Sequence, residues 1–261
     1  MRKELSFLLA LWKTNIAAVM EYRVAFISQI LGMILNNAVY FIFWVIFFDR
    51  FKQLRGWELN DMFLVFGVAA SAFGLTSFLF GNAFNLSEII ARGRLDYYLS
   101  LPRPVLLHTI SSRSIASGFG DLLYGLISYL FSGYYSLDGF VRFLIGVILA
   151  SIAFTAFMIL VHSLTFWLGN ASGFANLALN AMVTFALYPV SLFEGAAKLV
   201  LFTVVPAALM GALPAEFIRS FTWGSLGRLF LGAFLLLGLA VLVFHSGLKR
   251  YESGSAIQVE V

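Results

Sequence analysis

The sequence predicts an all-α integral membrane protein. Hydrophobic residues make up 61% of the 261-residue chain and charged residues only 11%, whereas soluble domains contain roughly 45–50% apolar residues. A soluble globule of this size would need more charge to cover its surface. Apolar runs almost free of charge also recur along the chain, and they approach the ~20 residues that a hydrocarbon core of about 30 Å requires.

The first predicted element is an amphipathic helix over residues 1–23 that lies at the membrane interface. Its apolar face carries Leu5, Leu8, Leu9, Trp12, Ile16 and Val19. Its other faces carry Lys3, Ser6, Lys13, Thr14 and Glu21. Basic residues on such a helix suit the phosphate head groups of lipids. A solvated lead-in helix is the alternative.

Six apolar segments then predict six transmembrane helices, at 24–48, 62–84, 114–134, 143–169, 173–193 and 229–248. Residues 195–225, between the fifth and the sixth, are also apolar, but Pro206 and Pro214 divide them into pieces too short to span. We expect a re-entrant pair of short helices there, with a seventh, kinked span as the alternative. The chain 1–261 is expected to form a single transmembrane domain.

The distribution of Lys and Arg predicts that both termini are cytoplasmic. With six spans, the side that holds the termini carries ten of these residues and the opposite side carries seven. The excess includes four residues in the N-terminal segment, and positive charge near the first span favours the cytoplasmic side. The connection 85–104 is then cytoplasmic, and the segment 195–225 is external.

Several function classes are excluded or disfavoured by what the sequence lacks. It has no cysteine, so a disulfide or a thiolate site is impossible. It has no Walker A, HExxH or GxSxG motif. His108, His162 and His245 lie far apart and are expected to be structural. The basic residues separate apolar runs and do not indicate nucleic-acid binding. We therefore expect no catalysis, metal or cofactor in this chain.

One carboxylate, Asp121, lies well inside a predicted span. It could face a cavity, as ion-coupled transport requires of an intramembrane ionisable group. It could instead lie near the cytoplasmic end of its helix, paired with Arg113 two turns earlier. We favour the pairing.

Amides are the other polar groups within the spans. Asn176 and Asn180 are four residues apart and share a helical face, and Asn36 and Asn37 lie in the first span. Such faces usually turn toward other helices and form interhelical hydrogen bonds. The same four amides are candidates to line a substrate path.

The connection 85–104 concentrates charge, aromatic residues and prolines. Glu88 and Arg92 are spaced for a favourable helical pair, Gly93 allows a turn, and Pro102 with Pro104 ends the apolar patch that follows. A short helix with charge on one side and Leu and Tyr on the other suits a groove in a cytoplasmic partner. A helix that lies on the bilayer is the alternative.

The stretch 88–102 resembles the I-x-x-G-x-L-D-x-x-L-x-x-P stretch of ABC-2 type transporter permeases, the membrane subunits of bacterial ABC exporters with a separately encoded ATPase. Further matches in order along the chain are Gly56-Trp57, Phe166-Trp167, Tyr188-Pro189, Pro206-Ala207 and Leu213-Pro214-Ala215. The resemblance therefore covers nearly the full length.

The resemblance implies partners and roles. Two permease subunits, identical or related, would form the path in the bacterial inner membrane, and two ATPase subunits would bind below and use ATP and Mg. The connection between the second and third spans would be the coupling helix, which contacts the ATPase through Glu88, Arg92, Gly93, Arg94, Leu95, Asp96, Leu99 and Pro102. Arg94 occupies a variable position of the pattern. The re-entrant helices at Pro206 and Pro214 would close the outer end.

The sequence thus predicts a permease that exports an amphipathic or hydrophobic substrate, such as a drug, lipid or peptide. An ion-coupled secondary transporter or channel is the alternative, and a scaffold or sensor is a third. The scarcity of buried charge and the elaborate connection 85–104 favour the permease.

Overall fold

The computed structural model describes residues 2–252, which contain helices and no strand. The α-helices are α1 (Arg2–Met20), α2 (Arg23–Arg50), α3 (Leu59–Leu79), α4 (Leu86–Ala91), α5 (Leu95–Leu99), α6 (Val105–Ser111), α7 (Ser117–Phe131), α8 (Leu137–Ser163), α9 (Thr165–Leu168), α10 (Ser172–Ala186), α11 (Gly195–Thr203), α12 (Ala212–Arg219) and α13 (Trp223–Leu248). Short 3-10 turns are η1 (Gly81–Asn85), η2 (Val190–Leu192) and η3 (Ala207–Leu209). The prediction of an all-α protein is confirmed.

Four helical segments are long and apolar enough to cross a membrane: Arg23–Arg50, Leu59–Leu79, Leu137–Leu168 and Trp223–Leu248. The third and fifth predicted spans contain the 15-residue helices α7 and α10. At 1.5 Å per residue each is about 22 Å long, which is shorter than a hydrocarbon core of about 30 Å. The helix α10 ends at Ala186 because Pro189 follows shortly after it.

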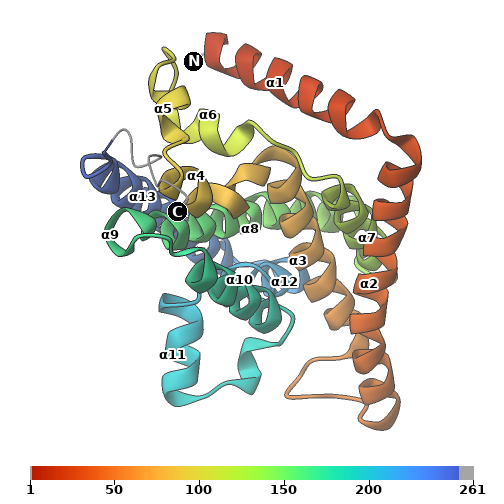
Figure 1. Cartoon of the computed structure of the whole chain (residues 1–261). Coiled ribbons are helices and arrows are strands. Elements are labelled where there is room, and N and C mark those ends of the chain that lie inside the picture. Colours follow the sequence, from red (N-terminus) through yellow and green to blue (C-terminus); the bar gives the residue numbers. More distant parts are fainter. Residues whose placement is uncertain (1, 253–261) are drawn as a thin grey trace.

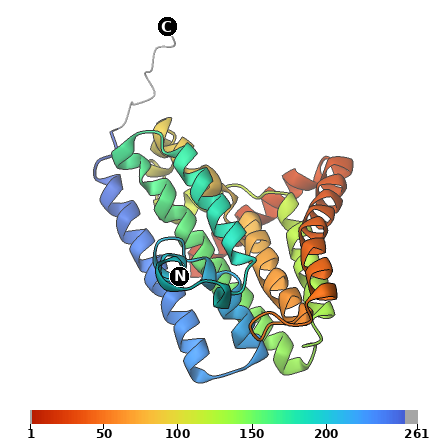
Figure 2. The same ribbon diagram turned by 90° about the horizontal axis from the view of Figure 1, so that it is seen from below.

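The long helices form two groups that meet along α3 and α8. The first contains α2, α3 and α7, and the second contains α8, α10 and α13 (Figure 2). The buried apolar side chains of α3 and α8 contribute to the core of both groups. At the centre, Thr76 of α3 hydrogen-bonds the hydroxyls of Ser151 and Thr155 on α8, at 3.0 and 3.1 Å.

Paired glycines bring α3 and α7 into backbone contact. A Cβ atom added to Gly74 would lie 2.6 Å from the carbonyl oxygen of Gly118, and one added to Gly118 would lie 2.8 Å from that of Gly74. About two helical turns away, Gly67 faces Gly125 in the same manner. Small residues at a membrane helix interface allow this close approach. The two helices therefore run antiparallel, and at these glycines the backbone of each helix meets the backbone of the other.

Polar contacts gather at the two ends of the bundle. Figure 1 shows α1, α5 and α6 at one end, and α11 with the α2–α3 connection at the opposite end. Glu4 and Arg103 pair at the first end, at 2.8 Å. At the second end Arg55 pairs with Glu194 at 2.6 Å. Residues that the charge distribution assigns to one side of the membrane thus pair with each other.

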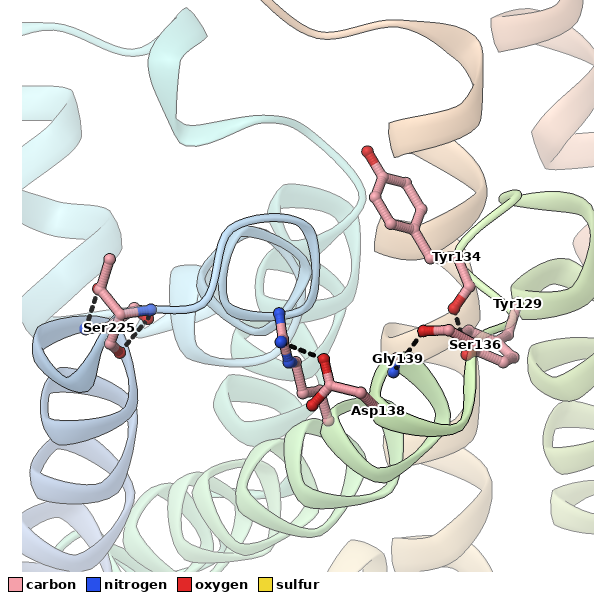
Figure 3. Close-up of polar contacts among 8 residues, drawn as sticks. Tyr129, Tyr134, Ser136, Asp138, Gly139 and Ser225 are labelled. Carbon is pink, nitrogen blue, oxygen red and sulfur yellow. Dashed lines mark hydrogen bonds and ion pairs between the residues drawn. The ribbon is translucent and has the colours of Figure 1, made fainter.

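The second end is closed by hydrogen-bonded turns. The Ser136 hydroxyl caps α8 by accepting from the Gly139 backbone N–H at 3.0 Å, and the Tyr129 hydroxyl donates to the Tyr134 carbonyl at 2.6 Å (Figure 3). Asp138 and Arg142 pair one turn into α8. These contacts fix the turn between α7 and α8.

The glycine contact between α3 and α7 is expected to be intolerant of even one methyl group. Gly74→Ala should lower the free energy of unfolding by roughly 1–3 kcal/mol, as over-packing does, because the added Cβ meets a backbone oxygen that cannot move alone. Thermal unfolding of the purified chain in detergent measures this loss.

The matched control is Gly32→Ala on α2, where an added Cβ meets no atom within 4 Å. This substitution should leave stability unchanged or raise it slightly, because Ala favours helix over Gly by about 1 kcal/mol. Equal stabilities for the two variants would contradict the assigned role of Gly74.

Candidate functional site

The connection between α3 and α7 folds as a compact unit of four short elements, η1, α4, α5 and α6. Its base is closed, because the Gly81 N–H donates to the Arg113 carbonyl and the Ile115 N–H donates to the Ser77 carbonyl, both at 3.0 Å. The Ser114 hydroxyl adds a bond to the Phe78 carbonyl at 2.6 Å. The end of α3 and the beginning of α7 are therefore held together.

Gly93 makes the turn between α4 and α5. Its φ of +69° lies in the left-handed region that glycine adopts without steric cost. The Gly93 N–H donates to the Ile90 carbonyl at 3.1 Å and the Arg94 N–H donates to the Ile89 carbonyl at 3.0 Å. These two bonds form the Schellman arrangement that ends many helices, and they set the angle of α5.

The connection has an exposed surface and a buried one. Exposed side chains include Arg92, Arg94, Tyr97, Leu99 and Pro102. Tyr97 and Leu99 are 63% and 42% exposed, a high degree for such large apolar groups. We call these five residues the coupling surface.

The other predicted contact residues lie at or behind that surface. Leu95 is completely buried in the core, and Gly93 is buried beneath the turn. Glu88 pairs with Arg92 at 2.6 Å, as their spacing indicates. Asp96 is half-buried and faces Tyr251, which follows α13. Burial, with a contribution from the Asp96 carboxylate, raises the pKa of Tyr251 to about 12.

The helix α1 docks on this connection through a face that the sequence pattern does not reveal. Besides the Glu4–Arg103 pair, the Trp12 indole N–H donates to the Leu79 carbonyl at 2.9 Å and the Asn15 amide donates to the Ser111 carbonyl at 3.0 Å. Leu5 and Leu9, on the predicted apolar face, remain more than half exposed. Of these docking residues only Trp12 belongs to the predicted apolar face, so Glu4 and Asn15 left no signal in the hydrophobic pattern.

His108 of α6 lies under α1. Its ring packs edge-on against Phe7 of α1, with centroids 5.0 Å apart, and against Tyr98, with centroids 5.2 Å apart. Burial lowers the pKa of His108 from its usual value of 6.5, and the nearby Arg103 guanidinium lowers it further. The docked arrangement therefore favours the neutral imidazole.

A cavity of about 330 Å³ opens among α2, α3, α7 and α10. Three of the four amides predicted for a substrate path, Asn36, Asn37 and Asn180, line it. Asn176 does not: it lines a second, polar cavity of about 350 Å³ beside Glu88, Arg92 and His162. Asn176 and Asn180, which the sequence predicts on one helical face, therefore line two different cavities one helical turn apart.

Asp121 also lines the first cavity, which corrects the expected pairing with Arg113. One Asp121 oxygen accepts from the Asn37 amide at 2.7 Å, and the side chain is almost completely buried. The helix α7 begins only at Ser117, so Arg113 precedes it and cannot share a helical face with Asp121. Arg113 is exposed beside a different hollow.

The other histidines have protein partners. The His162 Nδ1 atom lies 2.8 Å from the Ser87 hydroxyl, which joins α8 to α4. The His245 Nδ1 atom lies 2.8 Å from the Val241 carbonyl. Within residues 2–252, no three His, Asp or Glu side chains cluster in a way that would hold a metal ion.

The two prolines of the predicted gate occupy a buried stretch of short helices. Pro206 is buried between α11 and η3, and Pro214 lies in the first turn of α12, where proline costs no hydrogen bond. Pro214 packs against Gly146 of α8. At the end of α12, Arg219 pairs with buried Asp61 of α3 at 3.2 Å. Short helices therefore replace a seventh span.

Sequence comparison identifies one family. A family model described as ABC-2 family transporter protein matches residues 34–255. The match includes the connection between α3 and α7 and, apart from Met33, the residues that line both cavities. No curated protein matches the chain.

Docking of α1 is expected to weaken in acid. The pKa of His108 is lower in the docked state, so protection is complete above pH 6.5 and is lost as pH falls below that value. The loss continues as pH falls through the docked-state pKa of His108. Amide exchange protection of α1, corrected for intrinsic rates, measures it.

The control is His108→Gln, which keeps a polar planar group but cannot titrate. This variant should show the same α1 protection at pH 5 and at pH 7. A pH dependence that persists in His108→Gln would assign the effect to another group.

Proposed function

The chain belongs to the ABC-2 family of transporter proteins, and from this membership we propose that it is the permease subunit of an ATP-driven exporter for an amphipathic or hydrophobic substrate. The family match over residues 34–255 confirms the resemblance to ABC-2 type permeases. The observation that carries the proposal is the coupling surface, where Tyr97 and Leu99 stand exposed beside Arg92 and Arg94 on a rigidly backed turn.

The rigid backing supports a coupling role. Leu95 is anchored in the core, and the base of the connection is hydrogen-bonded between α3 and α7. A partner that moves the coupling surface therefore displaces the ends of both helices together. Closure of two ATPase subunits is a rigid-body motion of the kind that such a lever converts into helix tilting. ATP and Mg belong to those two subunits.

The proposed topology has six spans, with both termini on the cytoplasmic side of the bacterial inner membrane. The excess of Lys and Arg on that side supports it. The helices α7 and α10 would cross with help from the turns at their ends, and α1 would lie along the lipid surface through Leu5 and Leu9. The segment with Pro206 and Pro214 would close the outer end of the path.

A second permease subunit, identical or related, is part of the proposal. Asn36 and Asn180 at the rim of the 330 Å³ cavity are exposed. Amides that face hydrocarbon are costly, and they usually turn toward protein or a water-filled path. The rim therefore suits a face that meets a second subunit across the path.

Ion-coupled secondary transport remains the second candidate, and the buried Asp121 in a cavity is what favours it. Transport by the reconstituted chain and ATPase separates the two. An ATP-driven exporter stops when the ATPase loses its Walker A lysine, whereas an ion-coupled transporter stops when ionophores collapse the ion gradients.

The coupling surface is expected to fail when its apolar contact is replaced by charge. Leu99→Asp should abolish most substrate-stimulated ATP hydrolysis in the complex with the partner ATPase, because a buried unpaired carboxylate is costly at an interface. Phosphate release from the complex in nanodiscs measures this loss.

Leu137→Asp is the matched control, because Leu137 is 82% exposed at the opposite end of the bundle. This variant should retain stimulation, and both should fold, since neither side chain is buried. Normal ATP hydrolysis and normal transport in Leu99→Asp would remove the coupling role.

A further inference from the structure

One oxygen of the buried Asp121 has no partner. The side chain is 2% exposed, yet within residues 2–252 no hydrogen-bonding group reaches its second carboxylate oxygen. A buried polar atom left unpaired costs about 1–3 kcal/mol. The second oxygen lacks a partner in either protonation state: an ionised carboxylate needs a donor there, and a protonated one needs an acceptor for its O–H. Its partner must come from the contents of the cavity.

The described protein groups around Asp121 supply no hydrogen bond and no opposite charge to its second oxygen. The Asn37 amide nitrogen donates to the first Asp121 oxygen at 2.7 Å and to the Met33 carbonyl at 3.0 Å, which uses both of its protons. Among the side chains that the structure describes, those that line the cavity include no Lys, Arg or His. The negative charge of an ionised Asp121 is therefore uncompensated by the protein within this cavity.

Aromatic side chains form much of the remaining wall: Tyr40, Phe43, Trp44, Phe66, Phe73 and Tyr188. Trp44 and Tyr188 lie edge to face with centroids 5.4 Å apart. Aromatic faces attract cations within about 6 Å, and they also bury apolar surface. A divalent metal would need several oxygen ligands, and Asp121 is the single carboxylate among the described residues of the lining.

We propose that this cavity binds an amphipathic organic cation, with the Asp121 carboxylate as its counter-ion and the aromatic wall around its apolar body. The volume of about 330 Å³ lies within the ~300–1,000 Å³ range of small-molecule sites. The inference deepens the proposed export function, on which it rests, by giving the substrate class. Asn36 and Asn180 at the rim supply the polar entrance.

The test uses two probes of matched shape and opposite charge, tetraphenylphosphonium and tetraphenylborate. Equilibrium binding is measured on the full chain in nanodiscs, with empty nanodiscs subtracted and without ATPase or nucleotide. The cation should bind saturably and at least about tenfold more tightly than the anion, because charge complementarity acts at low dielectric. Absence of saturable cation binding, or equal affinity for both probes, overturns the proposal.

Asp121→Asn keeps the shape and the bond to Asn37 and removes the charge. It should weaken cation binding about tenfold or more and leave anion binding unweakened, whereas Asp121→Glu should retain cation binding. Asp49→Asn, an exposed carboxylate outside the cavity, should have no effect. An unchanged cation affinity in Asp121→Asn overturns the proposal.

Phe43→Leu provides the test if Asp121→Asn does not fold. Phe43 is a half-exposed residue of the cavity wall. Removal of its aromatic ring should weaken cation binding several-fold and leave the unfolding temperature unchanged. Unchanged binding would overturn the aromatic contribution.

Failure here is distinguishable from failure of the export function. Leu99→Asp should bind tetraphenylphosphonium as the unaltered chain does, because the coupling surface lies outside the cavity. Lost cation binding in a chain that still stimulates its ATPase overturns only the ligand class. Intact cation binding without any ATPase response overturns only the coupling role.

Discussion

The backbone contact between α3 and α7 is the constraint on which the rest of the arrangement depends. Gly74 and Gly118 remove the side chains that would separate the two helices, so dispersion forces and weak backbone contacts act at short range. The contact also places Asp121 of α7 beside Gly74, where its carboxylate reaches Asn37 of α2. A wider spacing would move the acid away from both the amide and the cavity. The same antiparallel pair carries the coupling connection at one end.

Helix type and much of the cavity could be predicted from composition and periodicity. The long apolar runs identify α2, α3, α8 and α13. Three of the amides proposed for a path, Asn36, Asn37 and Asn180, line one cavity in the structure. A periodic pattern predicts the helical face of a residue but not its position along the membrane normal. Asn176 therefore lies in a different cavity from Asn180, although the two share a face. The position of a residue along the membrane normal depends on where its helix begins and ends. Those ends are set by Pro189 and by tertiary hydrogen bonds such as that between Gly81 and Arg113.

The role of Asp121 and the docked face of α1 could not be predicted for a related reason. The expected Asp121–Arg113 pair assumed continuous helix, but the chain before Ser117 is tied to the end of α3 instead. On α1, the apolar stripe indicated lipid, while the helix docks through Glu4 and Phe7 and also through single polar atoms of Trp12 and Asn15. Such atoms leave little trace in a hydrophobic pattern, because their partners are backbone carbonyls far along the chain.

The bracing of the coupling connection has a consequence for biosynthesis. The α1 helix contacts α6 from one side, and Tyr251, beyond α13, packs near Asp96 from another. One brace is translated well before the connection and the other long after it. A nascent chain that has inserted α3 and α7 therefore still lacks part of the support behind the coupling surface. Completion of that surface is therefore tied to completion of the helical bundle. Under the proposed function, an ATPase would meet a complete docking site only on a fully folded chain.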